Sequence, residues 1–156
     1  MTGHVDRTAQ SGPQAGDRSP AHLVVLVDGI LTDGRVTQTA AAMARAGGCE
    51  LTVAALLTPT WLTGLAPMAG VVPVSAEDLG LDLVLRLTRS IDRYGVSWCI
   101  HPLVCEPYNE LAHLLRRRPA RALVTLAECE PGHRRTTRLA RRVSRRLGVP
   151  VQLCHP

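Results

Sequence analysis

Five short, mostly apolar runs alternate along this chain with longer segments whose apolar residues recur every three or four positions. Continuous apolar runs are typical of strands buried on both faces of a parallel sheet, and the wider spacing is typical of helices with one buried face. The five runs, each a predicted strand, occupy residues 22–28, 51–57, 97–104, 122–127 and 149–154.

Four helices are predicted between these strands, at residues 36–46, 79–94, 108–118 and 136–147. Gly47 and Gly95 follow the first two, as glycine often does where a helix ends. The strict alternation of strands and helices predicts an α/β fold, a doubly wound parallel sheet with helices on both faces. Pro102 lacks a backbone N–H, so the third strand is expected at an edge of the sheet.

The length of 156 residues suits one domain. Residues 1–21 are rich in Gly, Ser, Pro, Gln and Asp and are predicted to form a disordered tail before a domain at 22–156. No apolar stretch approaches the roughly 18 residues of a membrane-spanning helix. The five cysteines are odd in number and form no Cys-x-x-Cys pair, which indicates reduced thiols in a cytoplasmic protein without membrane contact.

Three passages resemble the universal stress protein family. Leu-Val-Val-Leu-Val-Asp-Gly at 23–29 is similar to that family's first strand, which ends in Asp. Gly-Gly-Cys-Glu-Leu-Thr-Val-Ala-Ala at 47–55 resembles the passage into its second strand, and Gly-Val-Pro-Val-Gln-Leu at 148–153 resembles its last strand. The resemblance covers nearly the whole domain and implies the adenine-nucleotide alpha-hydrolase-like fold with strand order 3-2-1-4-5.

The resemblance breaks down after the fourth strand. Nucleotide-binding members carry Gly-x-x-Gly there, then nine residues and Gly-Ser or Gly-Thr, and the glycines let backbone N–H groups surround phosphates. In this chain Ala127 and Glu130 take the glycine positions, and Thr137-Arg138 takes the later one. Glu128 and Glu130 would repel phosphate. The chain thus resembles a divergent member without the glycine-rich ATP loop, and we expect no ATP binding of the family's kind.

An altered anion site is the alternative. In the implied strand order, ligands would bind beyond the carboxyl ends of strands one and four. A small-ligand or adenine-nucleotide site there, for ATP or AMP, would use Asp28, Gly29, Gly132, His133, Arg134, Arg135, Thr137 and Arg138. In the competing interpretation Asp28 caps the following loop, the other residues form an exposed turn, and no cofactor binds.

Arginine is the source of the net charge of +5, and seven arginines lie between residues 134 and 146, in and just before the last predicted helix. Leu139, Val143 and Leu147 mark its expected buried face. Nucleic-acid association is a second alternative. Because no aromatic residue lies among these arginines, base stacking is not expected, and a solvated helix face is the favoured interpretation.

The tripeptide Cys-Glu-Pro follows both the third and the fourth strand, at Cys105 and Cys129. Two cysteines with His101 or His133 resemble a zinc donor set. Strands three and four are not neighbours in the implied order, so similar turns explain the repeat better than a shared metal. A redox role of either cysteine stays open.

No catalytic residue set is recognised, because the chain lacks Gly-x-Ser-x-Gly, His-Glu-x-x-His and Walker motifs. We therefore expect no enzyme. The resemblance implies a homodimer joined through the C-terminal strand, by Val149, Val151 and Leu153, and stress-related regulation through an unidentified protein partner.

Overall fold

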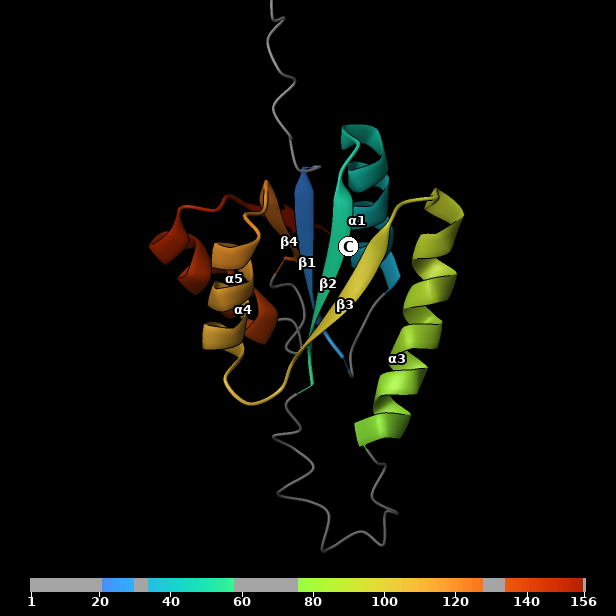
Figure 1. Cartoon of the computed structure of the whole chain (residues 1–156), viewed down its shortest axis with the longest axis horizontal. Coiled ribbons are helices and arrows are strands. Elements are labelled where there is room, and N and C mark those ends of the chain that lie inside the picture. The colour runs from blue at the N-terminus through green and yellow to red at the C-terminus, as the bar shows by residue number, and fades with distance from the viewer. Residues whose placement is uncertain (1–20, 30–33, 58–75, 128–133, 156) are drawn as a thin grey trace, which may run out of the picture.

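Five parallel strands form one sheet in the order β3-β2-β1-β4-β5 (Figure 1). The computed structural model describes residues 21–29, 34–57, 76–127 and 134–155. The strands are β1 (His22–Asp28), β2 (Glu50–Leu56), β3 (Trp98–Leu103), β4 (Ala122–Leu126) and β5 (Val151–Cys154). This topology confirms the predicted fold class and strand order.

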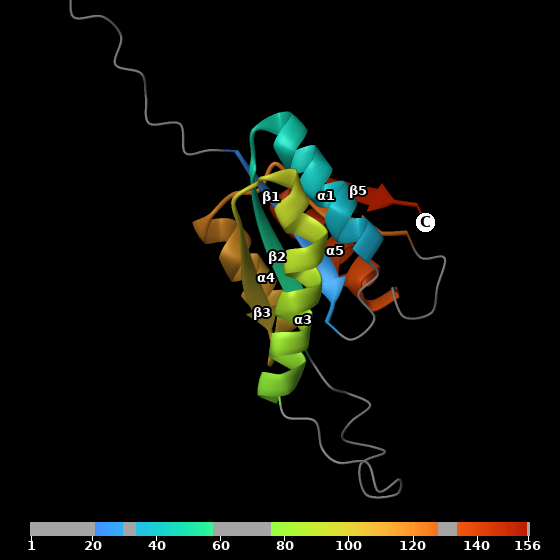
Figure 2. The same cartoon turned by 90° about the vertical axis from the view of Figure 1, so that its right-hand side faces the viewer.

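The helices form two layers. They are α1 (Gly34–Gly47), α3 (Ala76–Ile91), α4 (Pro107–Arg117) and α5 (Arg134–Leu147), with the 3-10 helix η1 (Asp92–Tyr94) after α3. α1 and α3 pack together on one face of the sheet, and α4 and α5 pack together on the other (Figure 2). The sheet is doubly wound, as the strand–helix alternation predicted.

The central strand β1 is buried along its whole length. Val25 and Val27 pack in the core beneath α1 and α3, and Val24 and Leu26 pack in the core beneath α4 and α5. Because successive side chains of a strand point to opposite faces, a strand covered on both sides needs apolar residues at nearly every position. This requirement explains the continuous apolar run at 22–28.

The ends of the last elements differ from the prediction. α5 begins at Arg134, two residues before the predicted start, so Arg134 and Arg135 belong to its first turn. β5 begins at Val151 and not at residue 149. Gly148 adopts a positive φ of 69° after α5, and Pro150 has no N–H for the sheet, so pairing starts after both.

β3 lies at the edge of the sheet, as Pro102 indicated. The alternation of bonds along β3 shows why proline is accommodated there. The carbonyls of Ser97 and Leu103 accept hydrogen bonds from the N–H groups of Leu51 in β2 and of Leu57 just after it. Odd-numbered residues of β3 therefore direct their backbone groups inward. Pro102 is even-numbered, and its missing N–H falls on the outer side.

The predicted disordered tail, apart from Ala21, lies outside the described residues, as do residues 58–75. Ala21 adjoins the sheet, because its carbonyl accepts a hydrogen bond of 2.9 Å from the Glu50 N–H. Among the described helices, none has the length and apolar character needed to cross a bilayer.

Candidate functional site

The carboxyl ends of β1 and β4 lie side by side, and this is where the sequence predicted a ligand site. Asp28 ends β1 and is only 7% exposed. Of the other predicted site residues, Gly132 and His133 lie outside the described residues. The remaining ones are Gly29, after β1, and four residues in the first turns of α5: Arg134, Arg135, Thr137 and Arg138.

Gly29 is fixed by the neighbouring strand. Its N–H donates to the Leu56 carbonyl at 2.8 Å. A Cβ atom at this position would lie 2.9 Å from that carbonyl oxygen and 2.6 Å from Cδ2 of Leu57. The chain can therefore leave β1 against β2 only with glycine here.

Arg86 of α3 reaches the same strand end, although nothing in the sequence nominated it. Its Nη2 donates to the Gly29 carbonyl at 3.2 Å and pairs with the Asp82 carboxylate at 2.8 Å. Its Nε is buried and has no hydrogen-bond partner among the described residues. A cation thus stands at the end of β1, and only the i,i+4 spacing of Asp82 and Arg86 was visible in the sequence.

Thr137 joins α5 to β4. Its side chain is fully buried, and its hydroxyl donates to the Leu126 carbonyl at 2.8 Å. Arg134, Arg135 and Arg138 are exposed on the same helix. The fold therefore brings Asp28, Gly29 and Thr137 to adjacent strand ends, while the three arginines stand on the outer surface of α5.

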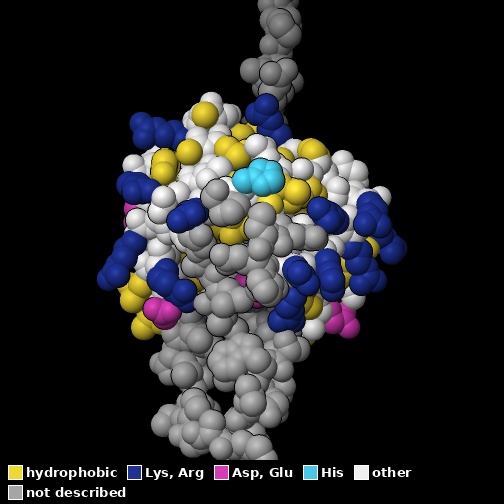
Figure 3. Space-filling model, turned by 180° about the vertical axis from the view of Figure 1, so that it is seen from behind, with side chains coloured by type: hydrophobic (Ala, Val, Ile, Leu, Met, Phe, Trp, Pro, Cys, Tyr) yellow, Lys and Arg dark blue, Asp and Glu magenta, His cyan; other side chains and the backbone are white. Residues whose placement is uncertain are grey.

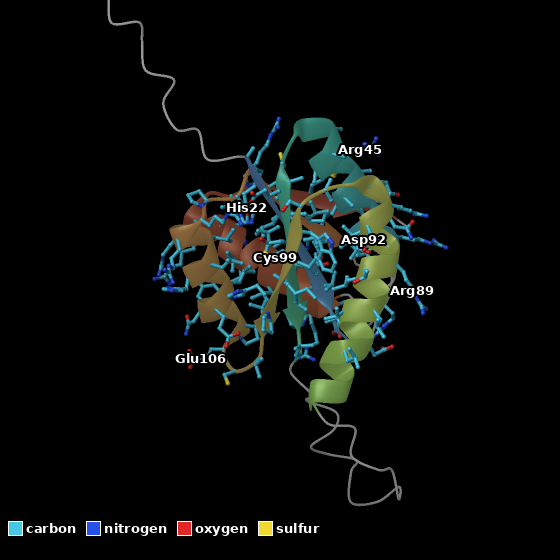
Figure 4. The ribbon with its side chains drawn as sticks, turned by 45° about the vertical axis from the view of Figure 1, so that its right-hand side comes forward. His22, Arg45, Arg89, Asp92, Cys99 and Glu106 are labelled. Atoms are coloured by element: carbon cyan, nitrogen blue, oxygen red, sulfur yellow. The ribbon has the colours of Figure 1, made fainter. Side chains whose placement is uncertain are left out.

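A second polar group lies at the opposite, amino end of the sheet. His22 of β1 is 2% exposed, and its Nε2 lies 2.6 Å from Oγ1 of Thr52 on β2. The same Oγ1 lies 3.4 Å from Sγ of Cys99, which is exposed on β3. Figure 4 labels His22 and Cys99 on their strands. The three side chains cross the sheet on the face of α4 and α5.

The pKa of His22 is lowered below 6.5, first by burial and then by the positive charge of Arg118. The carbonyls of Arg118 and Pro119 act in the opposite direction and are outweighed. Glu50 of β2 forms an ion pair with Arg118 nearby. His22 is therefore held neutral inside a basic neighbourhood.

Tyr108 of α4 lies against an arginine of α5, although no aromatic residue lies among those arginines along the helix. The Arg142 guanidinium carbon lies 4.4 Å from the centre of the Tyr108 ring, which is cation–π distance. The prediction considered α5 alone, and the aromatic partner comes from the packed helix beside it. Spacing along one helix could not reveal it.

The described cysteines are dispersed. Cys99 and Cys105 are exposed, whereas Cys49 and Cys154 are buried. Burial raises the pKa of the Cys154 thiol, against the opposing effect of a hydrogen bond with Thr39. Within the described parts of the chain, no three His, Cys, Asp or Glu side chains are grouped as a metal site would require. Cys129 falls outside those parts.

An apolar hollow of about 620 Å³ lies beside β5, lined by Met43, Ala46, Cys49, Pro150 and Val151 among others. Figure 3 views the molecule from this side and shows hydrophobic side chains in the middle of the face with arginines on both flanks. Among the described strands β5 pairs with β4 alone, so no other described strand adjoins its second side, which is called the open edge below.

Comparison with known proteins finds solved structures that share this fold. No family model matches the chain, and no curated protein matches its sequence. Many solved structures are similar, and three of them are described. A universal stress protein in complex with cAMP has a TM-score of 0.59 at 21% identity and covers 87% of this chain and 97% of its own. The Archaeoglobus fulgidus universal stress protein in complex with dAMP has a TM-score of 0.57 at 24% identity and covers 85% of this chain and 96% of its own.

An Arabidopsis thaliana universal stress protein family protein with AMP bound has a TM-score of 0.56 at 13% identity and covers 87% of this chain and 92% of its own. At these identities the likeness establishes the fold. The chain has the fold of universal stress proteins, as the resemblance of its strands predicted.

Proposed function

We propose that this chain is a non-enzymatic, cytoplasmic domain of the universal stress protein type, which acts in stress-related regulation through protein contacts and works as a homodimer joined along β5. The open edge of β5 is the observation that carries this proposal. An unpaired edge offers backbone donors and acceptors to another strand. The apolar hollow beside it adds surface that a second copy would bury.

The outward-facing groups of β5 can be identified from its bonds. The carbonyls of Pro150 and Cys154 accept hydrogen bonds from the N–H groups of Leu123 and Ala127. Even-numbered residues of β5 therefore direct their backbone groups toward β4. Val151 and Leu153 direct theirs away from the sheet, where a second strand would pair. The neighbouring Val149 precedes β5 and is half-buried.

Removal of one outward N–H tests this interface. Leu153→Pro eliminates a donor on the open side and spares the bonds to β4, whereas the control Leu153→Ala shortens the same side chain and keeps the N–H. Sedimentation velocity should give a dimer for the unmodified chain and for Leu153→Ala, and a monomer for Leu153→Pro. A monomeric unmodified chain, or a dimer that survives Leu153→Pro, would overturn the proposed interface.

Adenine-nucleotide binding is a second candidate function. It is supported by the cAMP, dAMP and AMP bound in the three similar structures and by the position of Asp28 and Arg86 at one strand end. Calorimetric titration of AMP, cAMP and ATP, with and without magnesium, tests it. Saturable binding that Arg86→Gln weakens would favour this candidate. The absence of saturation would leave the dimeric, nucleotide-free domain as the supported function.

A further inference from the structure

The outer surface of α5 carries many arginines and no acidic side chain. Its 14 residues include seven arginines and no Asp or Glu, and all seven are exposed. They are Arg134, Arg135, Arg138, Arg141, Arg142, Arg145 and Arg146. Several of them stand four residues apart, as Arg138 and Arg142 do, and like charges at that spacing destabilise a helix. The first turn places two cations at the positive end of the helix dipole.

Nearby carboxylates do not relieve this repulsion at three of these positions. Among the described residues, Arg138, Arg142 and Arg145 have no Asp or Glu within ion-pair distance. Exposed arginines that no described carboxylate balances create a positive surface potential, which attracts negatively charged molecules.

The end of α4 extends the same surface. Arg116 and Arg117 form its last turn, and α4 packs directly against α5. Glu106 and Glu110 lie at the other end of α4, and Glu110 is occupied by hydrogen bonds to backbone N–H groups. Basic side chains accordingly gather on the right-hand side of Figure 3, where α5 lies.

The contact between Tyr108 and Arg142 adds a second, independent feature. The ring holds the guanidinium 4.4 Å from its centre, and Arg142 remains exposed to solvent. A planar guanidinium held in this way presents its outer face for stacking. Bases of single-stranded nucleic acid stack on aromatic rings and on arginine planes.

From these observations we propose that the arginine face of α4 and α5 binds single-stranded nucleic acid, with its arginines on the phosphates and the Tyr108–Arg142 pair under a base. Arginine forks match phosphate oxygens in a bidentate manner. A membrane surface fits less well, because three of the four exposed large apolar side chains among the described residues, Leu81, Val84 and Leu85, lie on α3 in the opposite layer.

Fluorescence anisotropy with labelled oligo(U) and oligo(dT) tests the proposal on the full chain. The variant Arg138→Gln, Arg142→Gln, Arg145→Gln removes three charges from the face. The control Arg45→Gln, Arg89→Gln, Arg93→Gln removes three exposed charges from the other helix layer and leaves the same net charge. We expect the first variant to bind at least about tenfold more weakly and the control to change less than about threefold.

The salt dependence separates specific contacts from general attraction. For single strands the slope of log K against log salt is about −0.7 for each phosphate neutralised, so losing three contacts should make the slope shallower by about 2. Tyr108→Ala should weaken binding to either oligonucleotide roughly tenfold and leave an abasic oligonucleotide unaffected. Tighter binding to oligo(U) than to oligo(dT) would identify RNA as the natural form, and the reverse order would identify DNA.

Three outcomes would overturn the proposal. Equal losses in the two triple variants would show that net charge alone attracts the oligonucleotide. Polyglutamate that competes as well as oligo(U) at equal charge would indicate an acidic protein surface as the partner. Binding to vesicles of anionic lipid that exceeds oligonucleotide binding, and is lost in the same arginine variant, would indicate a membrane.

Discussion

The imidazole Nε2 of His22 lies 2.6 Å from the hydroxyl oxygen of Thr52, which links the first two strands through their side chains. His22 is buried, and burial is the main reason that its pKa lies below 6.5. A protonated imidazole would be desolvated and would stand near Arg118, so folding favours the neutral ring.

Stability should therefore depend on pH through His22. Its lowered pKa means that the unfolded chain binds more protons than the folded chain between the two pKa values, so the free energy of unfolding rises with pH in that window. We expect the contribution to be complete above about pH 6.5 and to be lost as the pH falls toward the folded pKa. Urea unfolding across this range should show the loss.

His22→Gln should reduce that pH dependence, because glutamine can bond to Thr52 without titrating. His113→Gln, on the exposed side of α4, is the control and should leave the slope as it was. If the free energy of unfolding of His22→Gln still changes with pH as in the unmodified chain, other groups cause the pH dependence. The charged groups nearest His22 are Glu50, Arg118 and the neighbouring Arg117 and Arg121.

Two glycines should respond oppositely to alanine. At Gly29 a Cβ would meet the Leu56 carbonyl at 2.9 Å, and backbone atoms yield little, so Gly29→Ala should lower the free energy of unfolding by about 1–3 kcal/mol. At Gly80, inside α3, nothing lies within 4 Å of the added atom. Gly80→Ala should raise it by about 0.5–1 kcal/mol, since glycine disfavours helix. Equal shifts in chemical denaturation would contradict this account.

Two buried threonines form a comparable pair. Thr137→Val removes the hydroxyl that donates to the Leu126 carbonyl and should destabilise the fold by about 1–3 kcal/mol. The Thr125 hydroxyl is buried with no partner among the described residues. Thr125→Val replaces it with a methyl group and should be neutral or stabilising by up to about 1 kcal/mol. Thermal unfolding of the two variants would test this difference. If Thr137→Val were more stable than the unmodified chain, the Thr137 hydroxyl would not stabilise the fold through its bond to Leu126.

Glu110 holds the start of α4. Its carboxylate accepts hydrogen bonds from the N–H groups of Val104, Cys105 and Glu106, at 2.8, 3.1 and 3.2 Å. Burial raises the pKa of Glu110, but these three bonds and the nearby His101 outweigh it, so the pKa lies below 4.5.

Glu110→Gln should lower the free energy of unfolding by about 1 kcal/mol, because a neutral amide accepts these bonds less well. The stabilisation is present above pH 4.5 and should disappear as acid protonates Glu110 below that value. Glu106→Gln is the matched control, since among the described residues the Glu106 carboxylate accepts only from the exposed Asn109 side chain. Equal effects at pH 7 would argue against a special role of Glu110.

The fold was accessible from the sequence because local patterns determine it. The apolar run at 22–28 predicted a strand covered on both faces, and Pro102 predicted the edge position of β3. The boundary of α5 was misplaced because an N-terminal Arg-Arg pair is unfavourable for a helix start, and the packing of Thr136 and Thr137 outweighs that preference.

The site was less accessible because its contacts join distant segments. Arg86 and Gly29 are 57 residues apart, and Thr52 and Cys99 are 47 apart. The spacing of apolar residues along the sequence does not predict contacts between such distant residues. Tyr108 meets Arg142 only because α4 and α5 lie side by side. The glycine-poor passage after β4, by contrast, was legible directly from residue types.

The two margins of the sheet differ in their capacity to grow. Pro102 deprives the outer side of β3 of a hydrogen-bond donor, whereas the outward N–H groups of Val151 and Leu153 are intact on β5. A protein with two receptive margins can add copies without limit and form fibres. If only the β5 edge can accept another strand, two copies related by a twofold axis would pair their β5 edges with each other. No pairing edge would then remain, and assembly would stop at the dimer. A single proline would thereby set an upper limit on the size of the complex.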